Sequence, residues 1–183
     1  MARPTRDVDS TTTSVASFDP VVSAGAWALV LGSMPGQRSL ADAQYYAHPR
    51  NLFWPIMGTL VGAGPDLPYD ERLATLRAEG IILWDVLARC ERPGSLDASI
   101  VRASEVPNPI GPLLVAQPDV RVIACNGGAA HQLLRRHVLP GLDDAVRARV
   151  HVLALPSTSP ANAAMPAEER LRAWSQLLDW RPR

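Results

Sequence analysis

The chain has 183 residues, of which 47% are hydrophobic, and it carries 18 basic and 18 acidic side chains, so its net charge is zero. A chain of this length and apolar content can bury a core within one domain, and it has no apolar run near the roughly 18 residues that a membrane span needs. All 18 basic residues are arginine. Because there is no global positive charge, any affinity for nucleic acid must come from a local cluster.

The first 20 residues are rich in Ser, Thr and charged side chains, and they lack a hydrophobic segment long enough for a secretion signal. We therefore expect a disordered tail over residues 1–20 and a single domain over residues 21–183. Three acidic residues in this tail, Asp7, Asp9 and Asp19, argue against a transit peptide. We expect a cytoplasmic protein.

Beyond the tail, apolar segments alternate with helical patterns, which is the order that a parallel sheet requires. The pattern predicts strands over residues 27–31, 81–85, 120–125 and 150–155. It predicts helices over residues 51–61, 69–78, 110–116, 128–138 and 166–178, the last with a proline at its start and acidic residues in its first turns. The predicted fold is an α/β three-layer α/β/α sandwich with a central four-stranded parallel sheet.

Turn-forming or polar residues directly follow each predicted strand. They are the glycines of GSMPG at residues 32–36, the segment after Asp85, Asn126, and the LPSTSP stretch at residues 155–160. In open parallel sheets, ligands bind outside the carboxyl ends of the strands. We therefore expect these four segments to line one rim of the sheet.

The most distinctive segment is LGSMPGQRSLADAQYYAHPRNLFW at residues 31–54. Glycines on either side of a proline let the backbone turn sharply and approach a ligand closely. YYAHPRN then presents two aromatic rings, an imidazole, a guanidinium and a carboxamide in a short stretch. Such groups suit the recognition of a planar base beside a phosphate, whereas G-x-x-P-G by itself is equally typical of a turn that closes a strand.

Metal-ligand patterns are missing from the sequence. Cys90 and Cys125 are isolated, with no C-x-x-C or Cys/His cluster, which argues against zinc, an iron–sulfur cluster or a disulfide scaffold. His131, His137 and His151 also have no partners at ligand spacing. We expect no metal and no cofactor.

In the order of these motifs the chain resembles the uracil-DNA glycosylase superfamily, and within it the hypoxanthine-DNA glycosylase branch, which is related to the mismatch-specific uracil and thymine glycosylases. The resemblance rests on GSMPG, YYAHPRN and FW, on LWDVLARCERPGSLDASI at residues 83–100, and on LPSTSPANA at residues 155–163. It implies a DNA repair enzyme, a monofunctional glycosylase. Such an enzyme flips a deaminated base, hypoxanthine or else uracil, out of double-stranded DNA and hydrolyses its N-glycosidic bond.

Two positions depart from the superfamily pattern. Many members have an acid or amide at the third position of the first motif, where this chain has Met34, which cannot polarise water. Many also have His or Asn before the Pro-Ser of the second motif, where this chain has Leu155, which cannot donate a hydrogen bond. The loss fits a leaving purine that is activated by protonation or by other hydrogen bonds.

The resemblance moves the catalytic role to Asn51, whose carboxamide can accept a hydrogen bond from water and donate one in return. Asparagine is also a favoured N-cap, so Asn51 could instead cap the helix that follows. Tyr46 occupies the position where relatives stack an aromatic ring on the flipped base. The other aromatic residues of this segment, Tyr45, Phe53 and Trp54, are expected in the core.

The remaining polar residues each have a structural alternative. Ser39 could contact the base or a nearby phosphate, or it could cap a helix. His48 could contact the base or a phosphate, or it could bond within its loop. Arg50 could contact a phosphate or be a surface charge. Asn126 could contact the ligand or simply form a tight strand-to-helix turn. The residues of the second motif could grip phosphates or supply the wedge that replaces the flipped base, or they could form a turn before the last helix.

The predicted base pocket comprises Gly32, Ser33, Met34, Pro35, Ser39, Tyr46, His48 and Asn126. The predicted DNA contacts are Arg50, Ser157, Thr158, Ser159, Pro160 and Asn162. Asp85, Ser95 and Asp97 recur in the middle segment of the family and are expected to shape the pocket, although Asp85 could equally cap the turn after its strand. We expect a nucleoid-associated monomer. Two alternatives remain open: a non-catalytic DNA-damage binding module with the same fold, and a hydrolase of free nucleosides.

Overall fold

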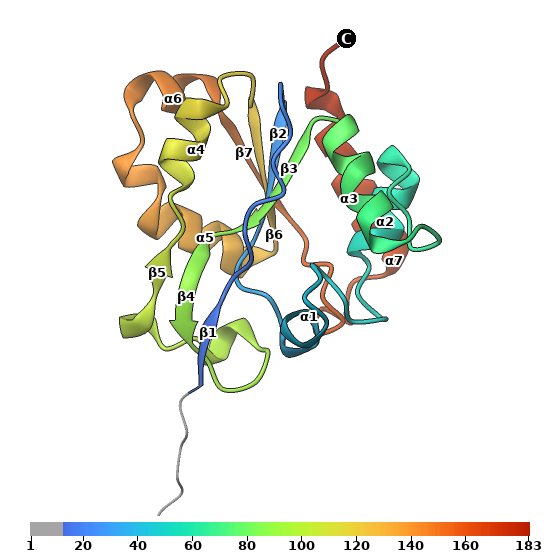
Figure 1. Cartoon of the computed structure of the whole chain (residues 1–183), viewed down its shortest axis with the longest axis vertical. Coiled ribbons are helices and arrows are strands. Elements are labelled where there is room, and N and C mark those ends of the chain that lie inside the picture. Colours follow the sequence, from blue (N-terminus) through green and yellow to red (C-terminus); the bar gives the residue numbers. More distant parts are fainter. Residues whose placement is uncertain (1–12) are drawn as a thin grey trace, which may run out of the picture.

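The computed structural model describes residues 13–183 and contains a parallel sheet of four strands in the order β3-β2-β6-β7 (Figure 1). The strands are β2 (Ala28–Gly32), β3 (Ile81–Asp85), β6 (Val122–Asn126) and β7 (His151–Leu155). Every residue of β2 and β3 is buried. Strands that are covered on both faces have nearly continuous apolar sequences, which explains the apolar runs seen here. The predicted sheet is confirmed, with small shifts in its strand boundaries.

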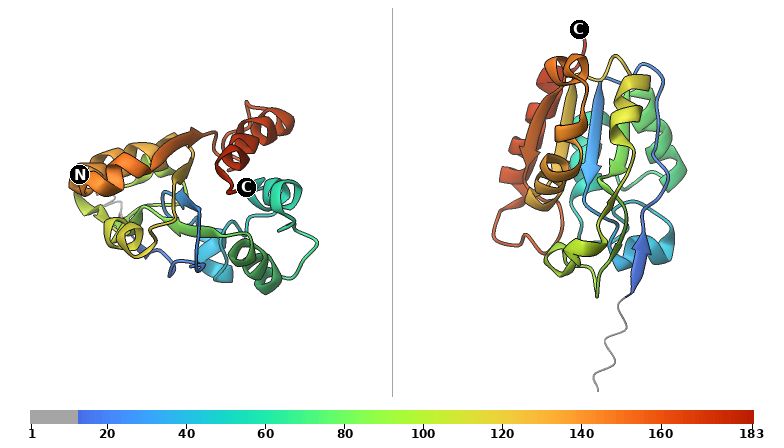
Figure 2. Two further views of the ribbon diagram at one scale, coloured as in Figure 1. Left: turned by 90° about the horizontal axis from the view of Figure 1, so that it is seen from above. Right: turned by 90° about the vertical axis from the view of Figure 1, so that its left-hand side faces the viewer.

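Helices cover both faces of this sheet, as Figures 1 and 2 show. One face carries α4 (Ile110–Ala116), α5 (Gly128–His137) and α6 (Asp144–Arg149). The other carries α2 (Phe53–Val61), α3 (Tyr69–Ala78) and α7 (Ala167–Ser175). In β2, Leu29 and Leu31 pack on the first group and Val30 on the second, since successive side chains of a strand point to opposite faces. The three-layer α/β/α sandwich is thus confirmed.

A small antiparallel sheet, in the order β1-β4-β5, was not predicted. Its strands are β1 (Ser14–Ala16), β4 (Leu87–Glu91) and β5 (Val106–Pro107). The expected disordered tail over residues 1–20 is therefore wrong for residues 14–16, because they pair with β4 in the register Ser14↔Glu91 and Val15 packs on the core. Residues 1–12 of that tail lie outside the described residues.

Several short elements complete the chain. Helix α1 (Gln37–Asp42), at the lower edge of Figure 1, follows the first loop. Single turns of 3₁₀-helix lie at Asp97–Ser99, Arg102–Ser104 and Leu139–Gly141. The last predicted helix is shorter than residues 166–178, because α7 ends at Ser175 and the chain continues as a 3₁₀ segment, Gln176–Trp180. No helix within residues 13–183 has both the length and the apolar character needed to cross a bilayer.

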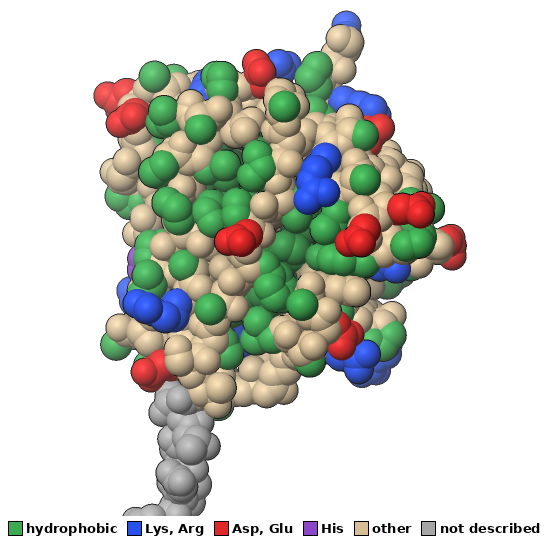
Figure 3. Space-filling view, in the orientation of Figure 1, with side chains coloured by type: hydrophobic (Ala, Val, Ile, Leu, Met, Phe, Trp, Pro, Cys, Tyr) green, Lys and Arg blue, Asp and Glu red, His purple; other side chains and the backbone are tan. Residues whose placement is uncertain are grey.

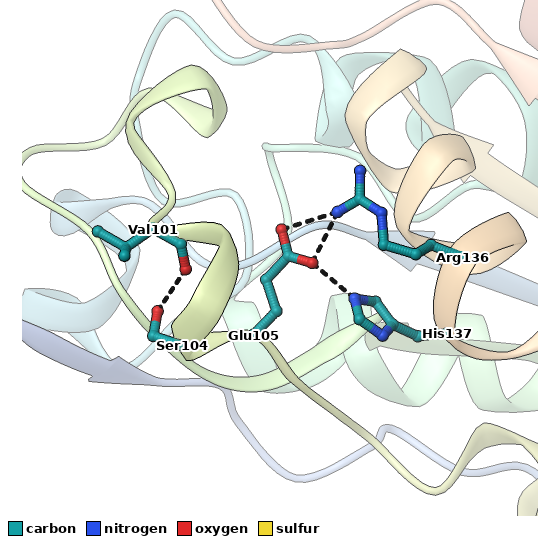
Figure 4. A network of polar contacts seen from close by, with 5 residues as sticks. All are labelled: Val101, Ser104, Glu105, Arg136 and His137. Atoms are coloured by element: carbon teal, nitrogen blue, oxygen red, sulfur yellow. Dashed lines mark hydrogen bonds and ion pairs between the residues drawn. The ribbon is translucent and has the colours of Figure 1, made fainter.

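Glu105 ties the small sheet to α5 (Figure 4). Its carboxylate accepts two hydrogen bonds from Nη1 of Arg136, at 2.9 and 2.7 Å, and one from Nε2 of His137 at 2.6 Å. Burial disfavours the ionised form, but the bonds from His137 and Arg136 outweigh it and hold the pKa of Glu105 below its ordinary value. His137 therefore has a structural partner, which the sequence did not reveal.

Candidate active site

A cavity of about 300 Å³ opens at the carboxyl ends of the parallel strands. The loops after β2 and β7 and the end of β3 form its walls, together with the loop that precedes the turn at Asp97–Ser99. The cavity thus collects the segments that were expected to share one rim. Its lining includes all eight residues of the predicted base pocket, Asn51, Asp85, Ser95, Asp97 and the second-motif residues Ser157, Thr158, Ser159 and Pro160.

The floor of the cavity is the parallel pair of Gly32 and Asp85, which are aligned at the ends of β2 and β3. A Cβ at residue 32 would collide with Oδ1 of Asp85 and would lie 3.1 Å from the Tyr46 hydroxyl. Glycine is therefore required here by the close approach of another side chain. Burial raises the pKa of Asp85 to about 8, with Asp97 adding to the shift and Arg92 opposing it.

Arg92 holds in place the loop after β2, which contains Met34 and Pro35, and is only 1% exposed. Its Nη1 donates to the carbonyl of Met34 at 3.4 Å, its Nη2 to the carbonyl of Pro35, and its Nε to the carbonyl of Gly94 at 3.1 Å. The planar fork of a guanidinium can hold several acceptors in a fixed arrangement. Arg92 was missed by the sequence analysis, since an arginine in ERPG resembles any surface arginine.

Tyr46 forms an aromatic wall. Its ring stacks on Phe53 with a centroid distance of 4.0 Å and an interplanar angle of 26°. Phe53 itself packs edge-on against Trp54 and Trp174. Tyr45, Phe53 and Trp54 are buried, which confirms their expected place in the core, although Tyr45 also reaches the cavity. One face of the Tyr46 ring is thus backed by packed aromatic side chains.

Ser39, His48 and Arg50 differ in their surroundings. The Ser39 hydroxyl is buried and accepts a hydrogen bond from the N–H of Ala47 at 3.2 Å, so it holds the loop together. Nδ1 of His48 accepts from the N–H of Arg50 at 3.1 Å. In the neutral ring the proton is therefore on Nε2, which is a donor for the cavity. The Arg50 side chain is exposed and does not line the cavity.

Asn51 lies just before the N-cap of α2, which is Leu52. Its Oδ1 accepts from the N–H of Phe53, the first residue of α2, at 2.9 Å, and its own N–H donates to the carbonyl of His48 at 2.8 Å. A structural bond at the helix start, the alternative to a catalytic role, is therefore present, and the two are compatible. A carboxamide oxygen has a second lone pair, and the bond from Phe53 fixes its orientation at the cavity wall.

Asn126 uses both ends of its carboxamide to hold Thr158. Nδ2 donates to the Thr158 hydroxyl at 2.9 Å, and Oδ1 accepts from the Thr158 N–H at 2.9 Å. Thr158 is fully buried. This geometry does not favour the predicted phosphate contact from Thr158, because its N–H donates to Asn126 and its hydroxyl, which accepts from Asn126, is buried. Asn126 likewise has a structural task at the cavity rim.

The rest of the second motif is also held internally. The hydroxyls of Ser157 and Ser159 accept from the N–H groups two residues further on, at 3.2 Å in each case. Nδ2 of Asn162 donates to the carbonyl of Ser157 at 3.1 Å, and Asn162 does not line the cavity. This leaves Pro160, which lines the cavity, as the better candidate for a wedge.

A second buried arginine supports this loop. Arg170 is 5% exposed and donates to the carbonyls of Met165 at 3.0 and 2.8 Å, of Ser159 at 3.3 Å, and of Asn162. Both loops around the cavity are therefore fastened by a guanidinium that binds main-chain carbonyls. The sequence analysis also missed Arg170.

The outer wall is polar. The Ser33 hydroxyl donates to Oδ1 of Asp97 at 2.6 Å, and the Ser95 hydroxyl accepts from the N–H of Gln37 at 2.9 Å. Asp97 is exposed as a residue, but partial desolvation of its carboxyl at the cavity raises its pKa, although the bond from Ser33 and the charge of Arg92 oppose this shift. Arg38, which the sequence analysis also missed, lines the cavity and pairs with Asp42 at 2.7 Å.

No group of three or more His, Cys, Asp or Glu side chains in residues 13–183 is arranged to hold a metal ion. Cys90 and Cys125 are both buried and free.

Fold and cavity together define a small α/β/α protein with a ligand site at the carboxyl ends of its parallel strands. The family model for the uracil DNA glycosylase superfamily matches residues 20–178, and the chain belongs to this superfamily.

The chain is similar to two proteins named hypoxanthine DNA glycosylase. It is 34% identical to that of Methanosarcina acetivorans over 146 residues, which are 79% of this chain and 86% of the relative. It is 35% identical to that of Methanosarcina barkeri over 111 residues, which are 60% of this chain and 69% of the relative. A solution NMR structure of a candidate uracil DNA glycosylase from Methanosarcina acetivorans superposes with a TM-score of 0.69 at 29% identity, covering 90% of this chain and 99% of the other. These findings confirm the family resemblance.

Proposed function

We propose that this protein is a monofunctional DNA glycosylase that excises hypoxanthine from double-stranded DNA. Its superfamily and the names of its relatives support a repair glycosylase for deaminated bases. The observation that carries the proposal is the cavity at the sheet rim, where Tyr46, His48 and Asn51 share one wall. An aromatic ring, an imidazole and a carboxamide are the groups that a flipped base and an attacking water require.

The base enters the cavity after it leaves the DNA stack. Base–aromatic stacking contributes on the order of 1–3 kcal/mol, and Tyr46 offers a ring that Phe53 holds in place from behind. The Nε2–H of His48 is available to a carbonyl oxygen or ring nitrogen of the base. The flipped base thus exchanges its stacking partners in DNA for a ring and a hydrogen bond in the protein.

Asn51 orients the water that attacks the sugar. The bond from the Phe53 N–H fixes the carboxamide, so its remaining lone pair and its Nδ2 keep one direction at the cavity wall. Cleavage of an N-glycosidic bond by an oxocarbenium-like route needs a positioned water more than a strong nucleophile. A lyase reaction through a Schiff base would need an amine nucleophile, and the sequence contains no lysine.

The DNA is held by few charges. Arg38 at the cavity and the exposed Arg50 are candidates for phosphate contacts, and the hydroxyls of Ser157 and Ser159 lie at the same rim. On the face shown in Figure 3, acidic and basic groups are interspersed and form no broad basic area. We expect the protein to act as a monomer on cytoplasmic DNA.

One assay tests the proposal. Duplex oligonucleotides that differ only in one base, hypoxanthine, uracil or xanthine, are incubated with excess protein, and abasic sites are revealed by alkaline strand cleavage. We expect cleavage of the hypoxanthine strand and its loss with Asn51→Ala. Tight binding of the hypoxanthine duplex without excision would instead indicate a non-catalytic binding module. Release of hypoxanthine from free inosine, but not from DNA, would indicate a nucleoside hydrolase.

A further inference from the structure

One polar group of the cavity has no task in the proposed reaction. Oδ2 of Asp85 is buried and has no hydrogen-bond partner among residues 13–183. Buried polar atoms in proteins are nearly always paired, so an exception that lines a ligand cavity indicates a group reserved for the ligand. Asp85 is only 3% exposed, and Gly32 leaves space for its carboxyl.

Within residues 13–183, four titratable groups lie near Asp85. Asp97 lines the same cavity, Arg92 holds the first loop by its carbonyls, and Tyr45 and Tyr46 lie on the segment after α1. The guanidinium of Arg92 is already bonded to three carbonyls. Burial and Asp97 therefore dominate over Arg92, and the pKa of Asp85 is about 8. The carboxyl thus carries a proton at neutral pH.

The leaving group needs such a proton. A purine departs poorly as an anion, and protonation of its imidazole ring withdraws electrons from the bond to the sugar. The two residues that depart from the superfamily pattern supply no proton donor. Met34 is apolar, and Leu155 is buried in the core away from the cavity. Arg92 and Asn126 are used to hold loops. His48 can hydrogen-bond the base through its Nε2–H, and Asp97, the other carboxyl of the cavity, already accepts from the Ser33 hydroxyl. Asp85 is the carboxyl with an unpaired oxygen at the floor of the cavity, and we take it as the acidic donor.

We infer that Asp85 is a further catalytic residue, the acid that protonates N7 of the departing purine; this inference rests on the proposed function. The carboxyl proton moves to N7 while the C1′–N9 bond breaks and its electron pair stays with the base. Hypoxanthine then leaves as a neutral tautomer with hydrogen on N7. The water held by Asn51 forms a bond to C1′ and releases one proton to solvent. Asp85 regains a proton when the base has gone.

The test is single-turnover excision from a hypoxanthine duplex as a function of pH. A proton donor works only in its protonated form, so the wild-type rate should be level below about pH 8 and fall about tenfold per unit above it. Asp85→Asn keeps the size of the side chain but has no acidic proton. We expect its rate at pH 7 to be lower by about 10²-fold or more, without the fall above pH 8. Asp119→Asn, an exposed change before β6, serves as the control.

A second substrate shows where the proton goes. In a duplex with 7-deazahypoxanthine, N7 is replaced by carbon, so the wild-type protein should excise this base at the slow rate of Asp85→Asn, and the two proteins should not differ. Binding of a non-cleavable 2′-fluoro hypoxanthine duplex should be nearly unchanged by Asp85→Asn.

The outcomes separate the two proposals. If the wild-type protein does not excise hypoxanthine, the proposed function fails and this inference fails with it. If the wild-type protein is active and Asp85→Asn has the same rate and pH profile, the inference alone is overturned. Rapid excision of 7-deazahypoxanthine, or a loss confined to binding of the 2′-fluoro duplex, would also overturn it.

Discussion

Asn126 and Thr158 are joined at both ends of one carboxamide, with two hydrogen bonds of 2.9 Å. Asn126 ends β6, and Thr158 lies in the loop after β7. The carbonyl of Thr158 in turn accepts from the N–H of Leu52 at 3.0 Å, next to Asn51. Through this pair the second motif is fastened both to the sheet and to the loop that carries the proposed catalytic residue.

The first prediction tests this pair. Asn126→Ala would leave the N–H and hydroxyl of buried Thr158 unpaired, so we expect the free energy of unfolding to fall by about 2 kcal/mol or more, and excision to fall as well. Asn126→Asp should be milder, because its carboxylate accepts from the N–H and the Thr158 hydroxyl can turn and donate to it. Chemical denaturation measures the difference. Equal stability of the alanine variant and the wild type would contradict a fastening role.

The second prediction separates the two tasks of Asn51. Asn51→Ala removes the acceptor for the first N–H of α2 as well as the polar group at the cavity, so it should lose about 1 kcal/mol of stability and reduce excision by roughly 10²-fold or more. Asn51→Asp keeps an oxygen that accepts from the Phe53 N–H but loses the Nδ2 donor. It should therefore retain stability and still excise poorly. If the aspartate variant is stable and has the wild-type single-turnover rate, Asn51 has only a structural role at the start of α2.

The third prediction concerns the stability cost of Asp85. The folded-state pKa of about 8 lies above the ordinary 3.8, so folding favours the protonated form and stability declines as pH rises from about 4 to about 8. Asparagine does not titrate. Asp85→Asn should thus gain stability over the wild type across this range, by more than about 1.4 kcal/mol at pH 7, the equivalent of one pKa unit. Thermal unfolding at pH 4, 6 and 8 measures the trend, and a constant difference would refute it.

The fourth prediction follows from Met34, which lines the cavity but cannot activate water. Excision of uracil should be weak beside excision of hypoxanthine in matched duplexes, and Met34→Asn should raise uracil excision relative to hypoxanthine. The comparison uses single-turnover rates for both bases in every opposing-base context. A wild-type preference for uracil in all contexts would place the protein in another branch of the superfamily.

The fifth prediction concerns the balance of 18 basic and 18 acidic residues. With Arg38, Arg50 and a few hydroxyls at the rim, the protein should neutralise roughly two to five phosphates, and the logarithm of its affinity should fall with salt at a correspondingly shallow slope. A titration of DNA affinity against salt concentration measures the slope. A slope equivalent to about ten contacts, or tight binding to undamaged duplex at physiological salt, would indicate an extended basic face instead.

The main sheet could be predicted because its strands are continuous apolar runs closed by Gly32, Asp85, Asn126 and Pro156, and the ends of parallel strands meet at one edge. Strands β1 and β5 could not be predicted, since three and two residues are too few to show a period. Their existence depends on backbone pairing with β4.

The sequence predicts which segments line the cavity, but it does not predict which side chains in these segments contact each other. Tyr46, His48 and Asn51 stand in one conspicuous stretch, and each lines the cavity. The roles of Arg92 and Thr158 depend on neighbours that are distant in sequence: Arg92 bonds to carbonyls 57 and 58 residues away, and Thr158 to an amide 32 residues away. Contacts between residues so far apart in sequence leave no local pattern, so only the tertiary structure reveals the roles of Arg92 and Thr158.

Arg92 and Arg170 hold the two cavity loops through hydrogen bonds to main-chain carbonyls. A guanidinium keeps its charge throughout the physiological pH range, so neither loop has to be assembled when the substrate arrives. The conformational change needed for recognition must then take place in the DNA, which bends and flips out a base while the protein loops keep their shape. A pair that contains a deaminated base opens more easily than an intact one. A rigid protein surface therefore favours DNA sites with a deaminated base, because their base pairs open more easily. This selection takes place before the base itself contacts the cavity.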